Sequence, residues 1–138
     1  MNRELKFRFW NPIAKKYSMS WKYNLTHDGK ILTYDVDMMD YDEPTDPKNS
    51  ILTIQQYTGL KDKNGVEIYE GDILTYTSNN GLDYRAPVVF SPTNLAYVLD
   101  TSGRHLFDDK YGDYLRLHKD HEYEIVGDIF ENNEQLES

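Results

Sequence analysis

Apolar and polar side chains alternate along most of the chain with a period of two. Leu5, Phe7 and Phe9 alternate with charged residues, and the run from Tyr17 to Leu25 alternates in the same way. This period is typical of a strand with one buried and one exposed face, whereas a helix repeats near 3.6. No segment sustains a helical period. The pattern predicts an all-β protein, with at most one helical turn at 132–136.

Short turn sequences that contain glycine separate the predicted strands. An Asn-Gly or Asp-Gly pair between two β-rich runs is typical of a hairpin, because a type I′ turn needs positive φ at both central positions. Such pairs, or a Ser-Gly pair, lie at 28–29, 64–65, 80–81 and 102–103. The strands expected between and beyond them are 31–34, 54–57, 66–69, 73–77, 88–90, 95–99, 114–117 and 123–130.

Two prolines flank one of these strands. Pro87 and Pro92 lie on either side of Val88-Val89-Phe90. Proline has no N–H to donate to a β-ladder and is therefore confined mainly to edges and strand ends. We expect a short strand at an edge or rim of the sheet.

The acidic segment 37–50 differs from the rest of the chain. It contains two prolines and has no consistent period, so we expect a loop. A single domain over 1–138 then comprises N-terminal strands and a hairpin (1–36), the acidic loop (37–50) and a β-barrel (51–138). Many short strands with frequent turns favour a small barrel or a sandwich. The expected fold is a small SH3-like barrel or roll with an N-terminal β-hairpin extension.

Composition restricts the compartment and the chemistry. The 138 residues include no cysteine, which excludes disulfides, thiol nucleophiles and cysteine-ligated metals. The start of the chain lacks the apolar run of a signal peptide, and no run is long enough to span a membrane. We expect a cytoplasmic protein with no membrane contact.

Catalytic and metal-binding patterns are absent from the sequence. Gly71-Asp72 and Gly127-Asp128 stand in similar settings, where the carboxylates fit turn capping better than a paired acid/base site. The acidic segment lacks the spacing of a calcium loop. His118 and His121 have no obvious third ligand, so we interpret them as exposed loop residues. We expect no catalytic residues, no cofactor and no metal.

The basic N-terminal segment is the candidate interaction surface. Residues 1–30 carry seven Lys/Arg against two Asp/Glu, whereas residues 31–60 carry one against six and the whole chain has a net charge of −9. Cations beside aromatic rings can bind single-stranded nucleic acid. The strongly negative total favours core or subunit contacts for the aromatic residues instead. The candidate residues are Lys6, Arg8, Trp10, Lys15, Lys16, Trp21 and Lys22.

One run of sequence is distinctive enough to indicate a family. Residues 57–73 read Tyr-Thr-Gly-Leu-Lys-Asp-Lys-Asn-Gly-Val-Glu-Ile-Tyr-Glu-Gly-Asp-Ile, and this run resembles the YopX family of phage and prophage proteins. Residues 3–10 and 124–132 resemble the opening and closing strands of that family. The resemblance implies an all-β, SH3-like fold and an origin in a bacterial cytoplasm. It implies no activity and supplies no catalytic residues.

These observations favour a non-enzymatic phage accessory protein that acts through protein–protein contact. Opposed charge segments and many tyrosines favour self-association as a homo-oligomer, with a host or phage protein as a further candidate partner. The alternative is a nucleic-acid-related module, either a weak binder through the basic segment or an acidic DNA mimic that occupies a host DNA-binding protein. Nucleic acid itself is the less favoured partner because of the net charge. An enzyme with an unfamiliar cleft is a third, weaker alternative.

Overall fold

The computed structural model describes residues 5–18, 23–28, 30–42, 52–92, 95–101 and 114–132. Every regular element in these ranges is a β-strand, so the all-β prediction is confirmed. The SH3-like character of the barrel stays a prediction. The chain divides into two compact units, one formed by Lys6–Gln55 and the other by Met1–Leu5 with Gln56–Ser138. We call them the N-terminal unit and the C-terminal unit; the chain passes from one to the other after Leu5 and again after Gln55.

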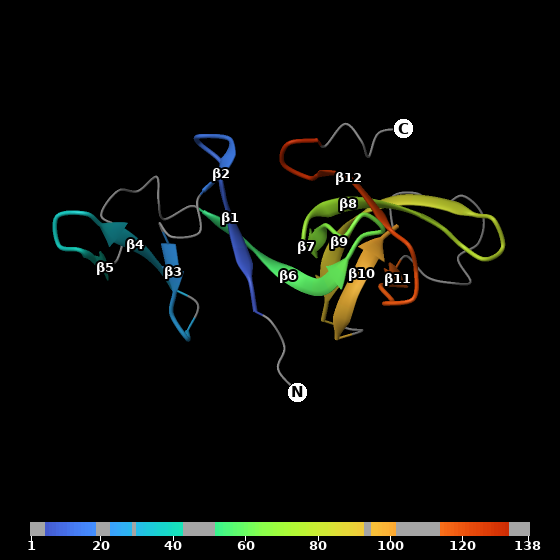
Figure 1. The fold of residues 1–138 in the computed structure, drawn as a ribbon, viewed down its shortest axis with the longest axis horizontal. Helices are drawn as coiled ribbons and strands as arrows, with labels where there is room; N and C mark the ends of the chain where they lie inside the picture. The colour runs from blue at the N-terminus through green and yellow to red at the C-terminus, as the bar shows by residue number, and fades with distance from the viewer. Residues whose placement is uncertain are drawn as a thin grey trace. The chain divides into compact units, whose positions relative to one another are not determined.

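The N-terminal unit contains short antiparallel strands (Figure 1). Strand β1 pairs with β2, and β4 pairs with β3 on one side and β5 on the other. Phe9, Tyr23 and Leu52 form the buried core of this unit, and the rings of Phe9 and Tyr23 are 5.3 Å apart. The strands are β1 (Phe7–Asn11), β2 (Lys16–Ser18), β3 (Tyr23–Leu25), β4 (Ile31–Asp35) and β5 (Asp40–Asp42).

The C-terminal unit is built around a five-stranded antiparallel sheet in the order β11-β10-β9-β8-β12. Its core includes Ile68, Leu74, Val88 and Leu99, which are at most 1% exposed. The strands are β7 (Glu67–Tyr69), β8 (Asp72–Thr77), β9 (Asp83–Ser91), β10 (Ala96–Asp100), β11 (Tyr114–Arg116) and β12 (Glu124–Asp128). Strand β6 (Thr53–Lys61) begins in the N-terminal unit and pairs with β7 through its second half.

Three hairpin turns were predicted correctly. Leu25 pairs with Ile31 across the turn at 28–29, and the turns at 64–65 and 80–81 join β6 to β7 and β8 to β9. Gly65 and Gly81 have φ of 82° and 83°, but Asn64 and Asn80 do not have positive φ, so these two hairpins are not closed by the expected type I′ turns. The Ser-Gly pair at 102–103 and most of the helical turn expected at 132–136 lie outside the described residues.

The prediction of an edge strand between the two prolines was wrong. Strand β9 is nine residues long, runs through Pro87 and lies in the middle of its sheet, between β8 and β10. Pro87 is paired with Ile73 of β8, whereas the pairing with β10 extends only as far as Val88. Residues 83–87 of β9 pair with β8 and residues 88–91 pair with β10, so Pro87 lies where one ladder ends and the other begins. The missing N–H is therefore tolerated at this junction.

Two segments of the N-terminal unit differ from their expected extent. The alternation from Tyr17 to Leu25 predicted one strand, but its two ends belong to β2 and β3, which lie in different sheets. The segment 37–50 was expected as a loop, yet Asp40–Asp42 forms β5 against β4, and 43–51 lie outside the described residues. Tyr41 packs its ring on Tyr34 at 5.2 Å, and this cross-strand pair stabilises a strand that the surrounding acidic residues concealed.

Candidate functional site

The predicted basic surface divides into buried and exposed residues. Arg8 donates through Nε to the Oε1 of buried Gln55 at 2.6 Å, and its guanidinium lies 4.6 Å from the centre of the Tyr17 ring. Trp10 is 5% exposed and packs edge-on against Tyr17. These side chains contribute to packing within the N-terminal unit. Lys6 is half-buried in the same unit.

Two other lysines of the predicted surface project from the turn between β1 and β2. The side chain of Asn11 accepts hydrogen bonds from the N–H groups of Ile13 and Ala14, both at 3.0 Å, and so fixes this turn. Lys15 and Lys16 are exposed. Ile13, in the same turn, is 53% exposed. We call residues 12–16 the basic turn. Trp21 and Lys22 lie outside the described residues.

The turn between β4 and β5 presents apolar side chains to solvent, which the sequence interpretation missed. Val36, Met38 and Met39 are 71%, 67% and 78% exposed, and they are accompanied by exposed Asp37 and Asp40. We call residues 36–40 the acidic tip. Isolated exposed apolar residues are common on proteins, but three in one four-residue turn concentrate exposed apolar area there. The sequence signal that could have identified this surface is the presence of three apolar residues, Val36, Met38 and Met39, within a short acidic segment.

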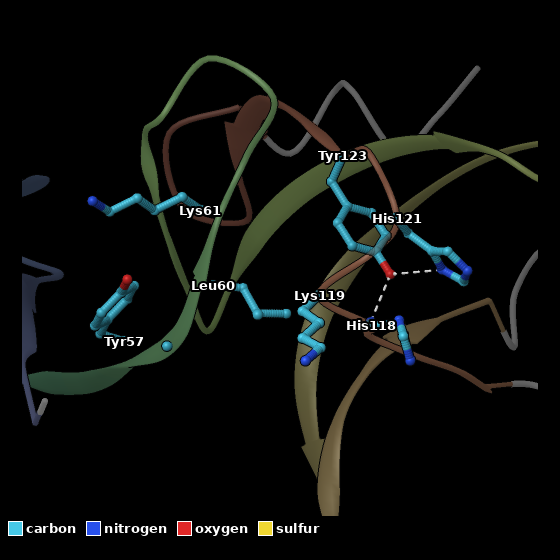
Figure 2. Close-up of a pocket in the computed structure, with 8 residues that line it drawn as sticks. Tyr57, Leu60, Lys61, His118, Lys119, His121 and Tyr123 are labelled. Atoms are coloured by element: carbon cyan, nitrogen blue, oxygen red, sulfur yellow. Dashed lines mark hydrogen bonds between the residues drawn. The ribbon is translucent and has the colours of Figure 1, made fainter. Parts of the chain in front are cut away.

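A hollow of about 330 Å³ lies on the C-terminal unit (Figure 2). Strand β6 supplies one wall and the loop between β11 and β12 supplies the other. The lining residues are Tyr57, Gly59, Leu60, Lys61, His118, Lys119, His121 and Tyr123. The first four belong to the run that resembles the YopX family, and the loop residues include the two histidines of the 118–121 segment.

The wall formed by β6 owes its shape to a β-bulge. Tyr57 pairs with Tyr69 and Lys61 with Glu67, so β6 has extra residues between these two pairs. Gly59, within the bulge, has φ of 90°, which side chains with a Cβ rarely adopt. The Oγ1 of Thr58 donates to the carbonyl of Ile68 at 2.8 Å and reconnects the bulged strand to β7.

The loop wall is fixed by the hydroxyl of Tyr123. This oxygen accepts a hydrogen bond from the backbone N–H of His118 at 2.9 Å and lies 3.3 Å from Nδ1 of His121 (Figure 2). Burial raises the pKa of Tyr123 above its ordinary value of 10.0, so the hydroxyl keeps its proton. That proton is available to His121. The His121 ring also stacks on Tyr76 at 4.9 Å, which fixes its orientation.

The paired-carboxylate alternative is not supported by the hydrogen bonds of the two aspartates. Asp72 and Asp128 are opposite each other in the pairing of β8 with β12, and both are buried. Asp72 accepts from the N–H of Tyr69 at 2.7 Å, and Asp128 accepts from the N–H groups of two residues of the following turn, both at 2.9 Å. Both carboxylates therefore cap turns, as the sequence interpretation favoured.

Two classes of site have no representative in the part of the chain that the structure describes. No group of three or more His, Asp or Glu side chains in the described ranges is arranged to hold a metal ion. Within the same ranges there is no helix long and apolar enough to cross a membrane.

The described residues define an all-β protein with exposed turns and a hollow on the C-terminal unit. The model of the YopX family, described as YopX protein, matches residues 6–137, and the chain therefore belongs to the YopX family. The chain is similar to the crystal structure of protein EF1440 from Enterococcus faecalis, with 24% identity, a TM-score of 0.58, and coverage of 98% of this chain and 99% of that one. It is also similar to protein YopX from Bacillus subtilis, with 17% identity, a TM-score of 0.57, and coverage of 94% and 95%. At these identities the structural similarity shows a shared fold. No curated protein matches the chain.

Proposed function

We propose that this chain is a non-enzymatic accessory protein of a phage or prophage, acting in the bacterial cytoplasm through protein–protein contact. We further propose that its first partner is a second copy of itself. Membership of the YopX family supports the phage origin and supplies no catalytic residues. The observation that carries the proposal is the exposed apolar surface of the acidic tip.

The acidic tip and the basic turn are complementary in both polarity and charge. The acidic tip combines Val36, Met38 and Met39 with two aspartates, whereas the basic turn combines exposed Ile13 with Lys15 and Lys16. Contact between the acidic tip of one copy and the basic turn of another would bury apolar side chains and bring opposite charges together. Methionine side chains adapt easily to such a surface. Two equivalent contacts of this kind would close a symmetric dimer.

Light scattering coupled to size-exclusion chromatography tests this proposal at tens of micromolar protein. We expect an oligomer whose population falls on dilution, and we expect the Val36→Ser/Met38→Ser/Met39→Ser variant to be monomeric. The matched control is Leu82→Ser/Leu95→Ser, which removes exposed apolar side chains from turns of the C-terminal unit. A control variant that dissociates as completely as the tip variant would contradict the proposal, as would a wild-type protein that is monomeric throughout.

A charge exchange tests the pairing of the two surfaces. Lys15→Glu/Lys16→Glu should weaken association, because it places like charges against Asp37 and Asp40. Mixing this variant with Asp37→Lys/Asp40→Lys should restore association as a hetero-oligomer. Failure of the mixture to associate, with both variants folded, would exclude this pairing.

The nucleic-acid alternative predicts a different result. If Lys15 and Lys16 bind phosphates, labelled oligonucleotides should bind at low salt and dissociate steeply as the salt concentration rises. Such binding, together with a monomeric protein, would favour the nucleic-acid module over self-association.

A further inference from the structure

The hollow of the C-terminal unit is lined by hydrogen-bond donors and cations in a strongly acidic protein. The chain carries 24 Asp/Glu against 15 Lys/Arg, yet none of the eight lining residues is a carboxylate. Two of them are lysines and two are histidines. A surface with this composition attracts anions in spite of the net charge of the molecule, since the local field depends on the nearest charges.

Neighbouring groups contact Nδ1 of each imidazole. Nδ1 of His118 accepts the backbone N–H of Asp120 at 3.1 Å, a contact shorter than the 3.6 Å to the Asp120 carboxylate. Nδ1 of His121 faces the hydroxyl of Tyr123, whose own acceptor side is occupied by the N–H of His118. An imidazole ring can present an N–H group to a ligand, so the two histidines add hydrogen-bonding groups to the lysines of the lining.

Two nearby carboxylates have partners outside the hollow. Glu124 forms an ion pair with Lys63 at 3.2 Å, and Asp62 accepts three backbone N–H groups. The carboxylate of Asp120, by contrast, lies 3.6 Å from Nδ1 of His118, a residue of the lining. No ion pair is recorded for Lys61 or Lys119 within the described residues. In Figure 2, Lys119 lies between Leu60 and His118, and Lys61 extends on the side of the hollow where Tyr57 lies. Both ammonium groups are carried on flexible stems that can turn toward a ligand.

We propose that this hollow binds a phosphate group, either as inorganic phosphate or as the phosphomonoester of a small molecule. A fully ionised phosphate has no O–H group, so all its oxygens act as hydrogen-bond acceptors. They therefore match a lining of ammonium and imidazole N–H donors. The volume of about 330 Å³ is at the lower end of the roughly 300–1,000 Å³ typical of ligand sites. Lys119 and His118 hold the phosphate on the loop side, and Lys61 approaches it from β6.

Titration of the full chain followed by ¹H–¹⁵N NMR tests the site, with amides of 59–61 and 118–121 as reporters. The probes are inorganic phosphate, glycerol 3-phosphate and adenosine 5′-monophosphate, with sodium acetate and sodium chloride at matched ionic strength as controls. We expect saturable shifts at these amides with a Kd of about 1 mM or tighter for at least one phosphate probe. Tighter binding of either ester identifies a phosphomonoester ligand, and tightest binding of inorganic phosphate identifies the free anion.

Lysine variants test whether the observed phosphate binding takes place in the hollow. Lys119→Gln should weaken phosphate binding roughly ten-fold, because a hydrogen bond to a charged group is lost. Lys61→Gln should weaken it by a smaller factor. The matched control, Lys15→Gln in the basic turn, removes the same charge from the other unit and should change the affinity by less than about two-fold. Absence of saturable shifts, equal responses to acetate and phosphate, or equal effects of Lys119→Gln and Lys15→Gln would each overturn the proposal.

Discussion

Asp62 connects the hairpin turn at 64–65 to β12 through its two carboxylate oxygens. Oδ1 accepts the N–H groups of Asn64 and Val66, both at 2.9 Å, and Oδ2 accepts the N–H of Ile125 at 3.3 Å. Desolvation by burial raises the pKa of this carboxyl, but the three N–H donors and neighbouring Lys63 together lower it below the ordinary 3.8. One short side chain thus joins segments about sixty residues apart in the sequence.

Replacement of this carboxylate should be costly at neutral pH. Asp62→Ala leaves three N–H groups without their acceptor, so we expect the free energy of unfolding to fall by roughly 1–3 kcal/mol. Urea unfolding at pH 7 measures this loss. The control is Asp83→Ala. The exposed carboxylate of Asp83 accepts a hydrogen bond from the Thr77 hydroxyl, and its removal should lower the free energy of unfolding by less than about 1 kcal/mol. Equal losses for the two variants would contradict the role of Asp62.

The stability difference between the wild type and Asp62→Ala should depend on pH in a defined direction. Because the folded-state pKa of Asp62 is lowered, its ionised form stabilises the fold above the unfolded-state value of about 3.8. This contribution disappears as the pH falls through the lower folded-state value. The stability difference between wild type and Asp62→Ala should therefore be constant near neutral pH and shrink below about pH 3.8. A difference that grows on acidification would have the wrong sign.

At the scale of the element, a β-bulge shapes β12 near its end. The pairing with β8 shifts between Ile125 and Gly127, and Gly127 has φ of 156°. A Cβ on Gly127 would lie only 2.5 Å from the Cβ of Asn132. Asn132 in turn donates its N–H to the carbonyl of Asp128 at 2.8 Å and closes the turn that follows the strand. The glycine is thus required by a close approach of the chain to itself.

A double-mutant cycle separates this contact from backbone strain. Gly127→Ala should destabilise the protein by roughly 1–3 kcal/mol. In an Asn132→Gly background the opposing Cβ is absent, so the cost of Gly127→Ala should be lower by at least about 0.5 kcal/mol. Chemical unfolding of the four proteins measures both quantities. Gly81→Ala serves as the control, because no atom lies within 4 Å of the added Cβ and its cost should be the same in both backgrounds.

The sequence predicted most strands of the C-terminal unit because β-rich runs lie between turns that contain glycine. Burial alternates along β6, whereas Ile73 with Leu74, and Val98 with Leu99, are buried in succession. Where a second constraint intervened, the prediction failed: β9 lies between β8 and β10 in spite of Pro87, and β5 is held by the Tyr34–Tyr41 contact within an acidic segment. The hollow was not predicted at all. Its walls come from residues 57–61 and 118–123, which contacts between distant parts of the sequence bring together: Asp62 accepts the N–H of Ile125, and the N–H of Lys63 donates to the carbonyl of Tyr123 at 2.8 Å.

At the scale of the whole molecule, the two units differ in how completely their cores are buried. Among the described residues, the C-terminal unit contains seven hydrophobic side chains that are at most 1% exposed, whereas the best-buried hydrophobic side chains of the N-terminal unit retain 4–9% exposure. The seven are Ile68, Ile73, Leu74, Ala86, Val88, Val98 and Leu99. Stability within a protein follows local burial and pairing, so the units should open with different free energies.

Native-state hydrogen exchange tests this difference residue by residue. We expect the amides of β8, β9 and β10 to exchange at least about ten-fold more slowly than those of β3, β4 and β5. The wild-type protein should be compared with the Val36→Ser/Met38→Ser/Met39→Ser variant, because contact between copies at the acidic tip would also protect β4 and β5. If the amides of β3–β5 are less protected in the tip variant than in the wild type, association between copies stabilises the N-terminal unit. This stabilisation would add to that from the unit's own small core. Equal protection of all strands in both proteins would show a single cooperative unit and contradict the division after Gln55.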